Sequence, residues 1–404
     1  MPRLPRICCV DLDTFFVSVE RLLDPSLRGK AVVVGGSKGG RGVVTSASYE
    51  ARAFGVRSGI SIRDASLLAP HAVFVPGHHD VYGSYSTRSR EIVERFSPIV
   101  IAASIDEQYV DFHGCERLYH RAVDADDDAT ILRTVRTLTK TIDAELGLPA
   151  SAGIATSKSM AKVACGLAKP KGVILVPEGA EEATLAPLPV RKLPGIGPVA
   201  EEKLRALGVV TLGQIADTPD ELLRPIFGAY TRGIRRDARG LGGSDLGRER
   251  PAFREHDPRG QYIGSISNER TFAEISPEHT ESMLCSLCER VCSRARSRGV
   301  RASTITLRLR YSDFHTITRS RTVTPTSVDV EVHRVILELY RNARTRPGSV
   351  RLVGVALSKL SLEEPQQKLP TFDGGDRRGE AVDKVREKFG YDAVHLATTI
   401  FGTS

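Results

Sequence analysis

The sequence lacks any long apolar run, and this excludes integral membrane proteins from consideration. Charged residues interrupt every apolar stretch well before the roughly 20 residues that a helix needs to cross a bilayer. The opening residues MPRLPRICCVDLD have only a very short apolar run before charge returns, so we expect no signal peptide. We therefore predict a protein of the cytoplasm with no membrane partner.

A cysteine framework for zinc is also missing. The seven cysteines come without an export signal, so we expect them to be reduced thiols. Cys285, Cys288 and Cys292 follow a C-x2-C-x3-C pattern, but a zinc site needs four ligands and no second pair lies nearby. Their spacing is that of one stripe on a helix, which predicts core packing.

Acidic residues are outnumbered by basic ones, which gives a formal net charge of +8 and a pI near 9.2. Such a balance suggests a polyanionic partner, although many soluble proteins are mildly basic without one. The length of 404 residues predicts about two to four domains.

An acidic pair interrupts the apolar stretch IVIAASIDEQYVDF at residues 99–112. Two β-branched runs around a short polar break predict an antiparallel hairpin. Neighbouring side chains on a strand point to opposite faces, so Asp106 and Glu107 share a site only where the chain bends. Two close carboxylates repel unless a cation lies between them, whereas a solvated turn tip is the alternative.

A strand–turn–helix unit opens the chain. Residues 7–10 read as a short buried strand that ends at Asp11, Leu12 and Asp13, and helical spacing follows from Phe15. A carboxylate at this place can hold a divalent cation that bridges phosphates, whose oxygens the first helical N–H groups receive. Asp11 is the better candidate ligand, and we expect Asp13 to cap the helix.

Groups suited to a triphosphate follow in two places. Tyr49 and Arg52 lie three residues apart and would share one helix face, where the guanidinium could bind phosphate oxygens in a bidentate fork. Lys169, just before Pro170, could also reach a triphosphate. For each of these cations an ordinary solvated surface position is the alternative.

The segment LPGIGP at residues 193–198 resembles a helix–hairpin–helix. Gly195 and Gly197 would let exposed N–H groups contact a nucleic-acid phosphate without reading sequence, although some copies of this motif only pack.

A β-α-β-β-α-β order over residues 259–360 predicts a small independent α+β domain. Its strands carry Arg308, Arg310, Arg319 and Arg321 in alternation, so we expect the four arginines to share one face. A basic sheet face fits a duplex backbone, and protection of an edge strand by charge is the alternative.

Four motifs together resemble the Y-family DNA polymerases, most closely their DinB, or DNA polymerase IV, branch. They are DLDTFFVSVE (11–20), SYEARAFGVRSGI (48–60), SIDEQYVDF (104–112) and SAGIATSKSMAKVACGLAKPKG (151–172). The resemblance implies a multidomain α+β right hand with a ferredoxin-like palm, small fingers, a helical thumb and a separate little finger. The expected divisions are palm 1–30 and 79–172, fingers 31–78, thumb 173–240, linker 241–258, little finger 259–360 and tail 361–404.

The same resemblance implies the site residues. The metal ligands would be Asp11, Asp106 and Glu107 with the Leu12 carbonyl, holding two Mg²⁺ ions, or Mn²⁺ in their place. Nucleotide contacts would come from the N–H groups of Phe15 and Phe16 and from Ser46, Tyr49, Arg52, Gly59 and Lys169. Phe16 matches the steric gate that excludes a ribose 2′-hydroxyl, and Gly59 matches the small residue against the nascent base pair. Gln108 and Thr14 depart from the usual residues without removing a ligand.

The implied activity is templated, low-fidelity DNA synthesis past damaged bases, from dNTPs onto a primer–template, and no second acidic constellation suggests a proofreading nuclease. We expect a monomer associated with the nucleoid. A sliding clamp is a further candidate partner, although the sequence shows no clear clamp-binding peptide at the C-terminus. The alternatives are a non-catalytic scaffold on the same fold and a template-independent nucleotidyl transferase.

Overall fold

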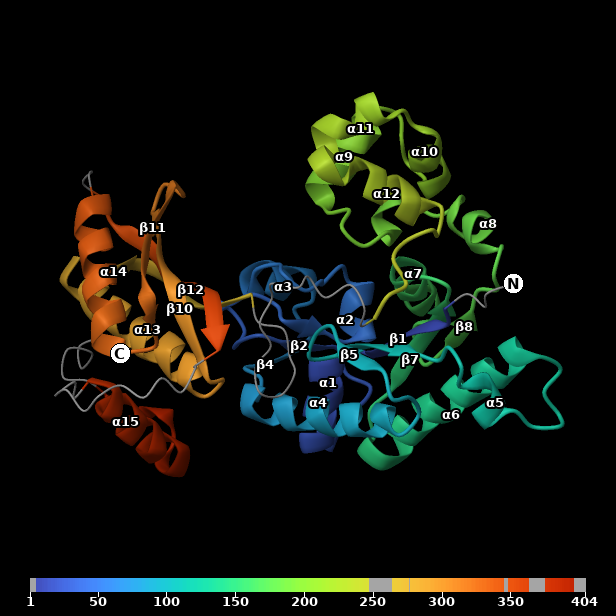
Figure 1. Cartoon of the computed structure of the whole chain (residues 1–404), viewed down its shortest axis with the longest axis horizontal. Helices are drawn as coiled ribbons and strands as arrows, with labels where there is room; N and C mark the ends of the chain where they lie inside the picture. The colour runs from blue at the N-terminus through green and yellow to red at the C-terminus, as the bar shows by residue number, and fades with distance from the viewer. Residues whose placement is uncertain (1–4, 247–263, 276, 345–347, 363–374, 396–404) are drawn as a thin grey trace. The chain divides into compact units, whose positions relative to one another are not determined.

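A computed structural model describes residues 5–246, 264–275, 277–344, 348–362 and 375–395 of the chain (Figure 1). The chain divides into two compact units, residues 1–249 and 250–404. Both units mix helices and strands, so the predicted α+β class is confirmed. None of the described helices is both long and apolar enough to span a membrane.

The first unit is built on a mainly antiparallel sheet of five strands in the order β5-β6-β1-β7-β8. Their bounds are Val100–Ala102, Glu107–Asp111, Ile7–Leu12, Ala150–Ala155 and Val173–Leu175. The pairing of β5 with β6 confirms the predicted hairpin around the acidic pair. Strand β1 is central, and its residues Ile7 to Val10 are fully buried.

Helices cover both faces of this sheet, which explains the continuous apolar run of β1. Ile7 and Cys9 pack in a cluster with α7 (Lys158–Ala168). Cys8, Val10 and Leu12 face the other way, toward α1 (Phe15–Leu23), α4 (His79–Glu94) and α6 (Asp127–Leu146). Asp11 has the parity of Ile7 and Cys9, so it projects on the α7 side.

Helix α7 lies unusually close to strand β7 because the strand has a glycine at the contact. A Cβ atom added to Gly153 would come 2.1 Å from the Cys165 nitrogen and 2.3 Å from the Ala161 carbonyl oxygen. Any larger residue would push α7 away from the sheet. Figure 1 shows α7 over β1 and β7.

A smaller sheet with strand order β3-β2-β4 follows α1 in the chain. Strand β2 (Val32–Val34) pairs antiparallel with β3 (Ser46–Ala47) and parallel with β4 (Val73–Val75). The same region holds two short helices, α2 (Tyr49–Ala53) and α3 (Ile62–Leu68).

The sheet region also contains the short helix α5 (Glu116–Tyr119). The last described part of the first unit, after β8, is helical. Its helices are α8 (Glu181–Leu185), α9 (Pro198–Ala206), α10 (Leu212–Asp217), α11 (Asp220–Phe227) and α12 (Thr231–Ala238). Short 3-10 turns occur at Pro25–Leu27, Val190–Lys192 and Gly228–Tyr230. The predicted linker 241–258 lies mostly outside the described residues.

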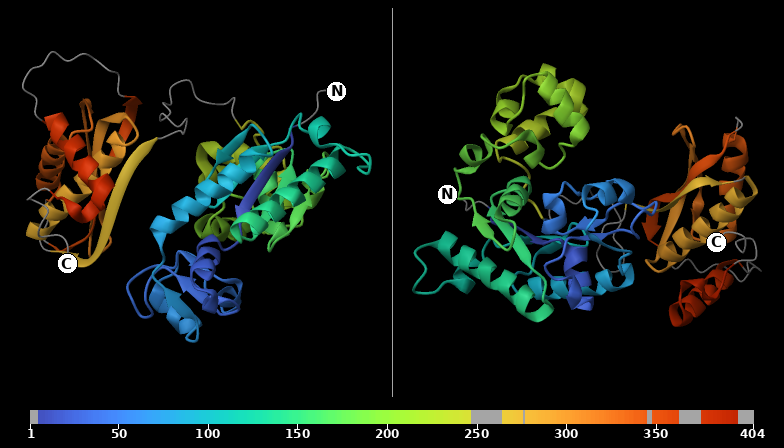
Figure 2. Two further views of the ribbon diagram at one scale, coloured as in Figure 1. Left: turned by 90° about the horizontal axis from the view of Figure 1, so that it is seen from below. Right: turned by 180° about the vertical axis from the view of Figure 1, so that it is seen from behind.

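The second unit has the predicted β-α-β-β-α-β order and a sheet in the order β11-β10-β12-β9. Its elements are β9 (Ser265–Ile275), α13 (Pro277–Arg296), β10 (Val300–Tyr311), β11 (Thr316–Thr326), α14 (Asp329–Ala343) and β12 (Val350–Leu362). Apolar residues of both helices pack with alternate residues of β10 and β12 in one core. Figure 2 shows these helices on one side of the sheet.

The expectation that four arginines share one sheet face is wrong. Arg308 and Arg310 alternate with buried leucines and so point away from the helices. Arg319 pairs with Leu307 and Arg321 with Ile305, and cross-strand partners point to the same face. Arg319 and Arg321 therefore lie on the helix side, where Arg321 forms an ion pair with Glu338 of α14. The hairpin register decided this, and alternation within each strand carries no information about it.

The three clustered cysteines of α13 are buried, which confirms their predicted packing role. Cys288 and Cys292 belong to the core of the second unit, and burial raises the pKa of both thiols. Cys285 contacts the ring nitrogen Nε2 of His333 on α14.

A further helix of the second unit, α15 (Gly375–Phe389), is joined to helix α13 by ion pairs. Arg386 of α15 pairs with Glu289 of α13, and their side chains are 5% and 3% exposed. Arg296 of α13 binds both Asp383 of α15 and Asp329 of α14. This part of the predicted tail is thus packed on the second unit rather than free of it.

The ion pair of Arg386 predicts a large loss of stability when one partner is removed. Arg386→Met leaves the Glu289 carboxylate buried without its cation, which costs about 3–5 kcal/mol in comparable cases. Hydrogen exchange of α13 amides in the full chain should speed up accordingly. Lys388→Met, which removes an exposed charge from the same helix, is the control and should not change exchange. Equal exchange in Arg386→Met and wild type would contradict this account.

Candidate active site

The sheet register brings two of the predicted carboxylates side by side. Asp11 of β1 is the direct antiparallel partner of Glu107 at the start of β6, so both side chains project on the α7 face. The N–H of Leu12 donates to the carbonyl of Asp106 at 2.9 Å, which places Asp106 beside the end of β1. Burial raises the pKa of Asp11, and the charges of Asp106 and Glu107 add to that rise. The three carboxylates therefore converge.

Lysines of the α7 segment neutralise these carboxylates. Lys169, which directly follows α7, forms an ion pair with Asp11, and Lys162 within α7 forms one with Glu107. Burial opposes the charge of each lysine, but the carboxylate partner outweighs burial and raises the pKa of both ammonium groups. Sequence reasoning gave Lys162 no role, although its spacing of seven residues from Lys169 places both near one side of the helix.

In this structure the carboxylates are paired with lysines and do not form a ready set of metal ligands. Asp106 accepts a hydrogen bond from the hydroxyl of Ser104. Among the residues that the structure describes, no three acidic, histidine or cysteine groups are close enough to hold a metal ion as they stand.

A polar cavity of about 120 Å³ opens beside these carboxylates. It is lined by Asp11, Leu12, Thr14, Phe15, Phe16, Thr45, Ser46, Arg52, Ser58, Asp106 and Lys169. Eight of the predicted metal and nucleotide residues thus meet at one cavity. Gly59 is not among the lining residues; it follows Ser58, and its N–H donates to the Val44 carbonyl at 2.8 Å.

The start of α1 presents backbone N–H groups to this cavity. Thr14 precedes the helix in a left-handed conformation, with φ 45° and ψ 45°, and no side chain caps the helix. Phe15 and Phe16, the first two helical residues, line the cavity. An uncapped helix N-terminus attracts anions, because its N–H groups lack intrahelical acceptors.

The prediction that Asp13 caps α1 is wrong. The carboxylate oxygen Oδ2 of Asp13 accepts hydrogen bonds from the Ser151 hydroxyl and from the N–H of Lys171, each at 2.8 Å. Its other oxygen, Oδ1, accepts one from the Tyr49 hydroxyl at 3.3 Å and lies 3.6 Å from the ammonium of Lys169. The buried carboxylate therefore joins β7, α2 and the loop after α7, which only the tertiary structure brings together.

Tyr49 and Arg52 share one face of α2, as predicted. The Arg52 guanidinium lies over the Tyr49 ring, 5.3 Å from its centre, and its Nε donates to the Ala47 carbonyl at 2.9 Å. Burial and then the charge of Asp13 raise the pKa of Tyr49 to about 12, so its hydroxyl keeps its proton at neutral pH. Arg52 reaches the cavity, whereas Tyr49 borders Asp13.

A second aromatic ring supports Phe16. Tyr82 of α4 stacks on it with ring centres 4.3 Å apart and ring planes 13° apart. The Tyr82 hydroxyl is itself held by the buried carboxylate of Glu20 on α1. Sequence reasoning missed Tyr82, because residues 66 positions apart are paired only by the packing of α4 on α1.

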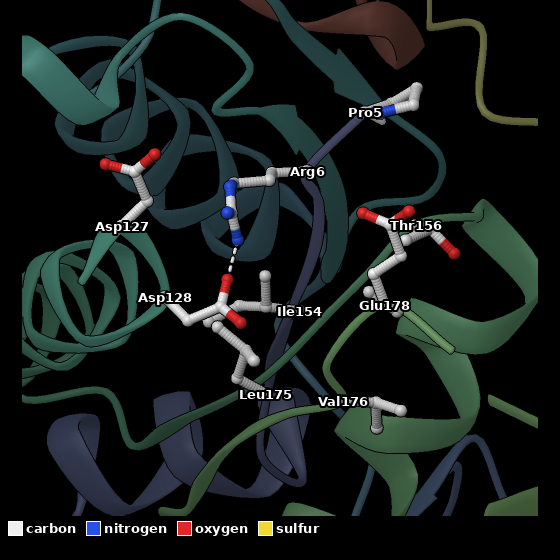
Figure 3. A pocket seen from close by; sticks show the side chains of 10 residues that line it. Pro5, Arg6, Asp127, Asp128, Ile154, Thr156, Leu175, Val176 and Glu178 are labelled. Carbon is white, nitrogen blue, oxygen red and sulfur yellow. Dashed lines mark hydrogen bonds and ion pairs between the residues drawn. The ribbon is translucent and has the colours of Figure 1, made fainter. Parts of the chain in front are cut away.

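Another cavity, of about 210 Å³, lies at the opposite end of β1 from Asp11. In Figure 3 the Arg6 side chain points to Asp128, with which it pairs, and Arg6 also pairs with Glu116. Asp127 and Glu178 line the same cavity. Its arginine is thus already neutralised by carboxylates, so this cavity is the poorer candidate for a phosphate ligand.

The predicted nucleic-acid contacts are not among the lining residues of either cavity. Gly195 has φ +92°, and a Cβ atom added at Gly195 or Gly197 would meet nothing within 4 Å. The backbone at this turn before α9 is therefore open to approach by a ligand. Arg308, on the open sheet face of the second unit, pairs with Glu269 across the gap that Gly354 leaves.

Comparisons with known proteins follow the same division of the chain. The impB/mucB/samB family matches residues 10–166, its C-terminal domain matches 264–369, and the HHH motif of the IMS family matches 178–209. A DNA polymerase IV of Dehalococcoides mccartyi is 37% identical over 98% of this chain and 97% of its own length. The chain belongs to the Y-family DNA polymerases. A DNA polymerase IV of Streptomyces coelicolor, also 37% identical, covers 95% of this chain with 77% of its own length.

Solved structures of Y-family polymerases have the same fold. A chimera of Dbh and Dpo4 has a TM-score of 0.74 at 23% identity, covering 88% of this chain and 99% of its own. An insertion ternary complex of Dbh has a TM-score of 0.61 at 23% identity, covering 87% and 98%. The predicted architecture of palm, fingers, thumb and little finger is confirmed. This Y-family polymerase is a DNA-directed DNA polymerase of the translesion class.

The stacked pair of Phe16 and Tyr82 predicts that Tyr82 matters for the choice of sugar. Tyr82→Leu removes the ring that supports Phe16, and stacking of this kind is worth about 0.5–1.5 kcal/mol. Discrimination against ribonucleotides, measured as the ratio of kcat/KM for dNTP and rNTP, should fall by about two- to ten-fold. Tyr85→Leu, on the same helix, is the control. An unchanged ratio in Tyr82→Leu would show that Phe16 needs no support.

Proposed function

We propose that Asp11, Asp106 and Glu107, together with the Leu12 carbonyl, hold two Mg²⁺ ions for nucleotidyl transfer. Carboxylate and carbonyl oxygens are the donors that Mg²⁺ prefers. Three converging carboxylates need cations, and in the structure two lysines meet that need. The bound ions would lower the pKa of the primer 3′-hydroxyl and neutralise charge on the triphosphate and leaving pyrophosphate.

The residues around the cavity would bind and align the triphosphate. Lys169 and Arg52 supply positive charge, Ser46 a hydroxyl, and Phe15 and Phe16 their backbone N–H groups. Tyr49 would add its hydroxyl once the triphosphate draws it from Asp13. These contacts would align the triphosphate for in-line attack by the 3′-hydroxyl. Most of the rate enhancement would then come from positioning and from stabilisation of charge.

Phe16 would act as the steric gate. Its ring lines the cavity and is supported by the stacked Tyr82. It would therefore leave no room for a 2′-hydroxyl on the incoming sugar. Gly59, next to the cavity residue Ser58, would leave open space against the nascent base pair. A site with few groups close to the bases exerts little selection on base-pair shape, which agrees with synthesis past lesions.

Primer–template DNA and dNTPs are the proposed partners. The structural neighbour described as an insertion ternary complex of Dbh DNA polymerase supports this choice. Gly195 and Gly197 would contact the DNA backbone through N–H groups. Arg308 and Arg310 would do so from the open sheet face, and Arg319 and Arg321 from the edge strand β11.

Domain limits and cellular setting complete the proposal. We assign residues 1–30 and 79–172 to the palm, 31–78 to the fingers, 173–240 to the thumb and 259–360 to the little finger. We further propose a monomer in the cytoplasm at the nucleoid. Recruitment by a sliding clamp stays a prediction, and residues 396–404 lie outside the described part of the chain.

The adjacency of Asp11 and Glu107, with Asp11 itself lining a cavity that also holds Arg52 and Lys169, is the observation that carries this proposal. A non-catalytic scaffold would not need to keep three carboxylates together. A template-independent transferase would have no use for the helix–hairpin–helix or for the separate C-terminal domain.

Primer extension with separate dNTPs on a defined template tests the assignment. Asp106→Ala should reduce extension at least about 10³-fold, because removing a metal ligand removes stabilisation made in the transition state. DNA affinity should stay within about two-fold of wild type. Asp111→Ala, which removes a carboxylate from the far end of β6, is the control and should extend the primer. Wild-type extension by Asp106→Ala would defeat the proposal, and extension without a template would favour the transferase.

The gate is tested by changing Phe16 alone. Phe16→Ala opens space for the 2′-hydroxyl, so the kcat/KM ratio for dNTP over rNTP should fall by about 10²-fold or more, while dNTP incorporation continues. Phe15→Leu, which alters the neighbouring buried ring, is the control. Unchanged sugar discrimination in Phe16→Ala would remove Phe16 from this role.

A further inference from the structure

Two lysines from one helical segment occupy the carboxylates that are assigned to the metal ions. Lys162 pairs with Glu107 and Lys169 pairs with Asp11. They are seven residues apart, about two helical turns, and α7 packs on the sheet face from which Asp11 and Glu107 project. A single packing contact therefore supplies both ammonium groups.

The two lysines differ in what else they can reach. Lys169 lines the cavity beside Arg52 and Ser46, whereas neither Lys162 nor Glu107 is among the lining residues. Lys169 also lies 3.6 Å from Asp13, so it has a second anion next to it when it leaves Asp11. A triphosphate in the cavity can thus bind Lys169 while Lys162 stays with Glu107.

An ammonium group on Asp11 competes with a divalent cation for the same oxygens. Like charges a few ångströms apart repel strongly in a half-buried site, so the metal binds at Asp11 only when Lys169 moves away. A bound triphosphate offers Lys169 new oxygens and so favours that movement. Conversely, a metal at Asp11 releases Lys169 for the triphosphate. Each ligand therefore relieves a cost that the other would otherwise bear.

We propose that Lys169 is an exchangeable counter-ion that couples metal binding to nucleotide binding, whereas Lys162 is a resident counter-ion of Glu107. The inference rests on the proposed function, because it takes Asp11 and Glu107 as metal ligands. Thermodynamic linkage makes the coupling reciprocal: metal strengthens nucleotide binding by the same factor as nucleotide strengthens metal binding. The coupling makes the charged site assemble with both ligands rather than with either alone.

The first measurement is the affinity of the full chain for Mn²⁺ without nucleotide or DNA. Electron paramagnetic resonance of the free ion serves as the readout. Lys169→Met removes the cation that competes at Asp11, and Lys162→Met removes a resident positive charge beside the site, so each should tighten Mn²⁺ binding by about five-fold or more. Lys171→Met is the matched control, because Lys171 pairs only with Asp143 at the surface among the contacts described. It should leave the affinity unchanged.

Nucleotide binding is the second measurement and separates the two lysines. A fluorescent dNTP is titrated into each variant in EDTA and again in saturating Ca²⁺. The Kd in EDTA divided by the Kd in Ca²⁺ gives the coupling. Complexation of Ca²⁺ by the nucleotide in solution is the same for every variant, so it cancels between them. The ratio should fall at least about five-fold in Lys169→Met and stay at the wild-type value in Lys162→Met.

Specific outcomes overturn the inference. Mn²⁺ affinity that is unchanged or weaker in Lys169→Met would show that Lys169 does not compete with the metal. An equal loss of coupling in both variants would show a general charge effect instead of an exchange by Lys169. Failure of the metal assignment itself is recognised separately, because Asp11→Ala would then bind Mn²⁺ as tightly as wild type.

Discussion

Repulsion between carboxylates on neighbouring strands is the constraint on which the first unit depends. The antiparallel register sets Asp11 directly beside Glu107, and the bend before β6 adds Asp106. Such a cluster is stable only with cations close to it. The fold provides them from α7 and its C-terminal end, so the helix that packs on the sheet also neutralises the site.

The position of α7 follows from small residues. Gly153 leaves no side chain between β7 and the backbone of α7, and the helix consequently sits close enough for its lysines to reach the strand ends. Asp13 then ties the loop after α7 to β7 through Lys171 and Ser151. The packing of α7, the neutralisation of the carboxylates and the proposed nucleotide site therefore depend on one arrangement, and a change that shifts α7 should affect all three.

The second unit separates its charges by face. The helix side holds an apolar core, and the ion pairs of Arg296 with Asp383 and of Arg386 with Glu289 attach α15 to helix α13 of this core. The open face carries Arg308 and Arg310 among hydroxyl-bearing residues such as Thr306. A surface of this kind suits the regular, sequence-independent charge of a nucleic-acid backbone.

The sequence by itself determined the secondary-structure elements and the identity of the candidate carboxylate and cationic site residues. Buried strands, helix spacing and residue chemistry are visible within a few neighbouring positions. The β-α-β-β-α-β order, the hairpin around Asp106 and the shared face of Tyr49 and Arg52 were predictable for that reason. Tertiary structure alone decided the partners: Asp13 binds β7 and α2 instead of capping α1, Tyr82 supports Phe16, and Arg319 lies opposite Arg308. Arg319 is the cross-strand partner of Leu307, so it lies on the other sheet face from Arg308. These arrangements depend on register and on contacts between distant segments, and no local pattern encodes either.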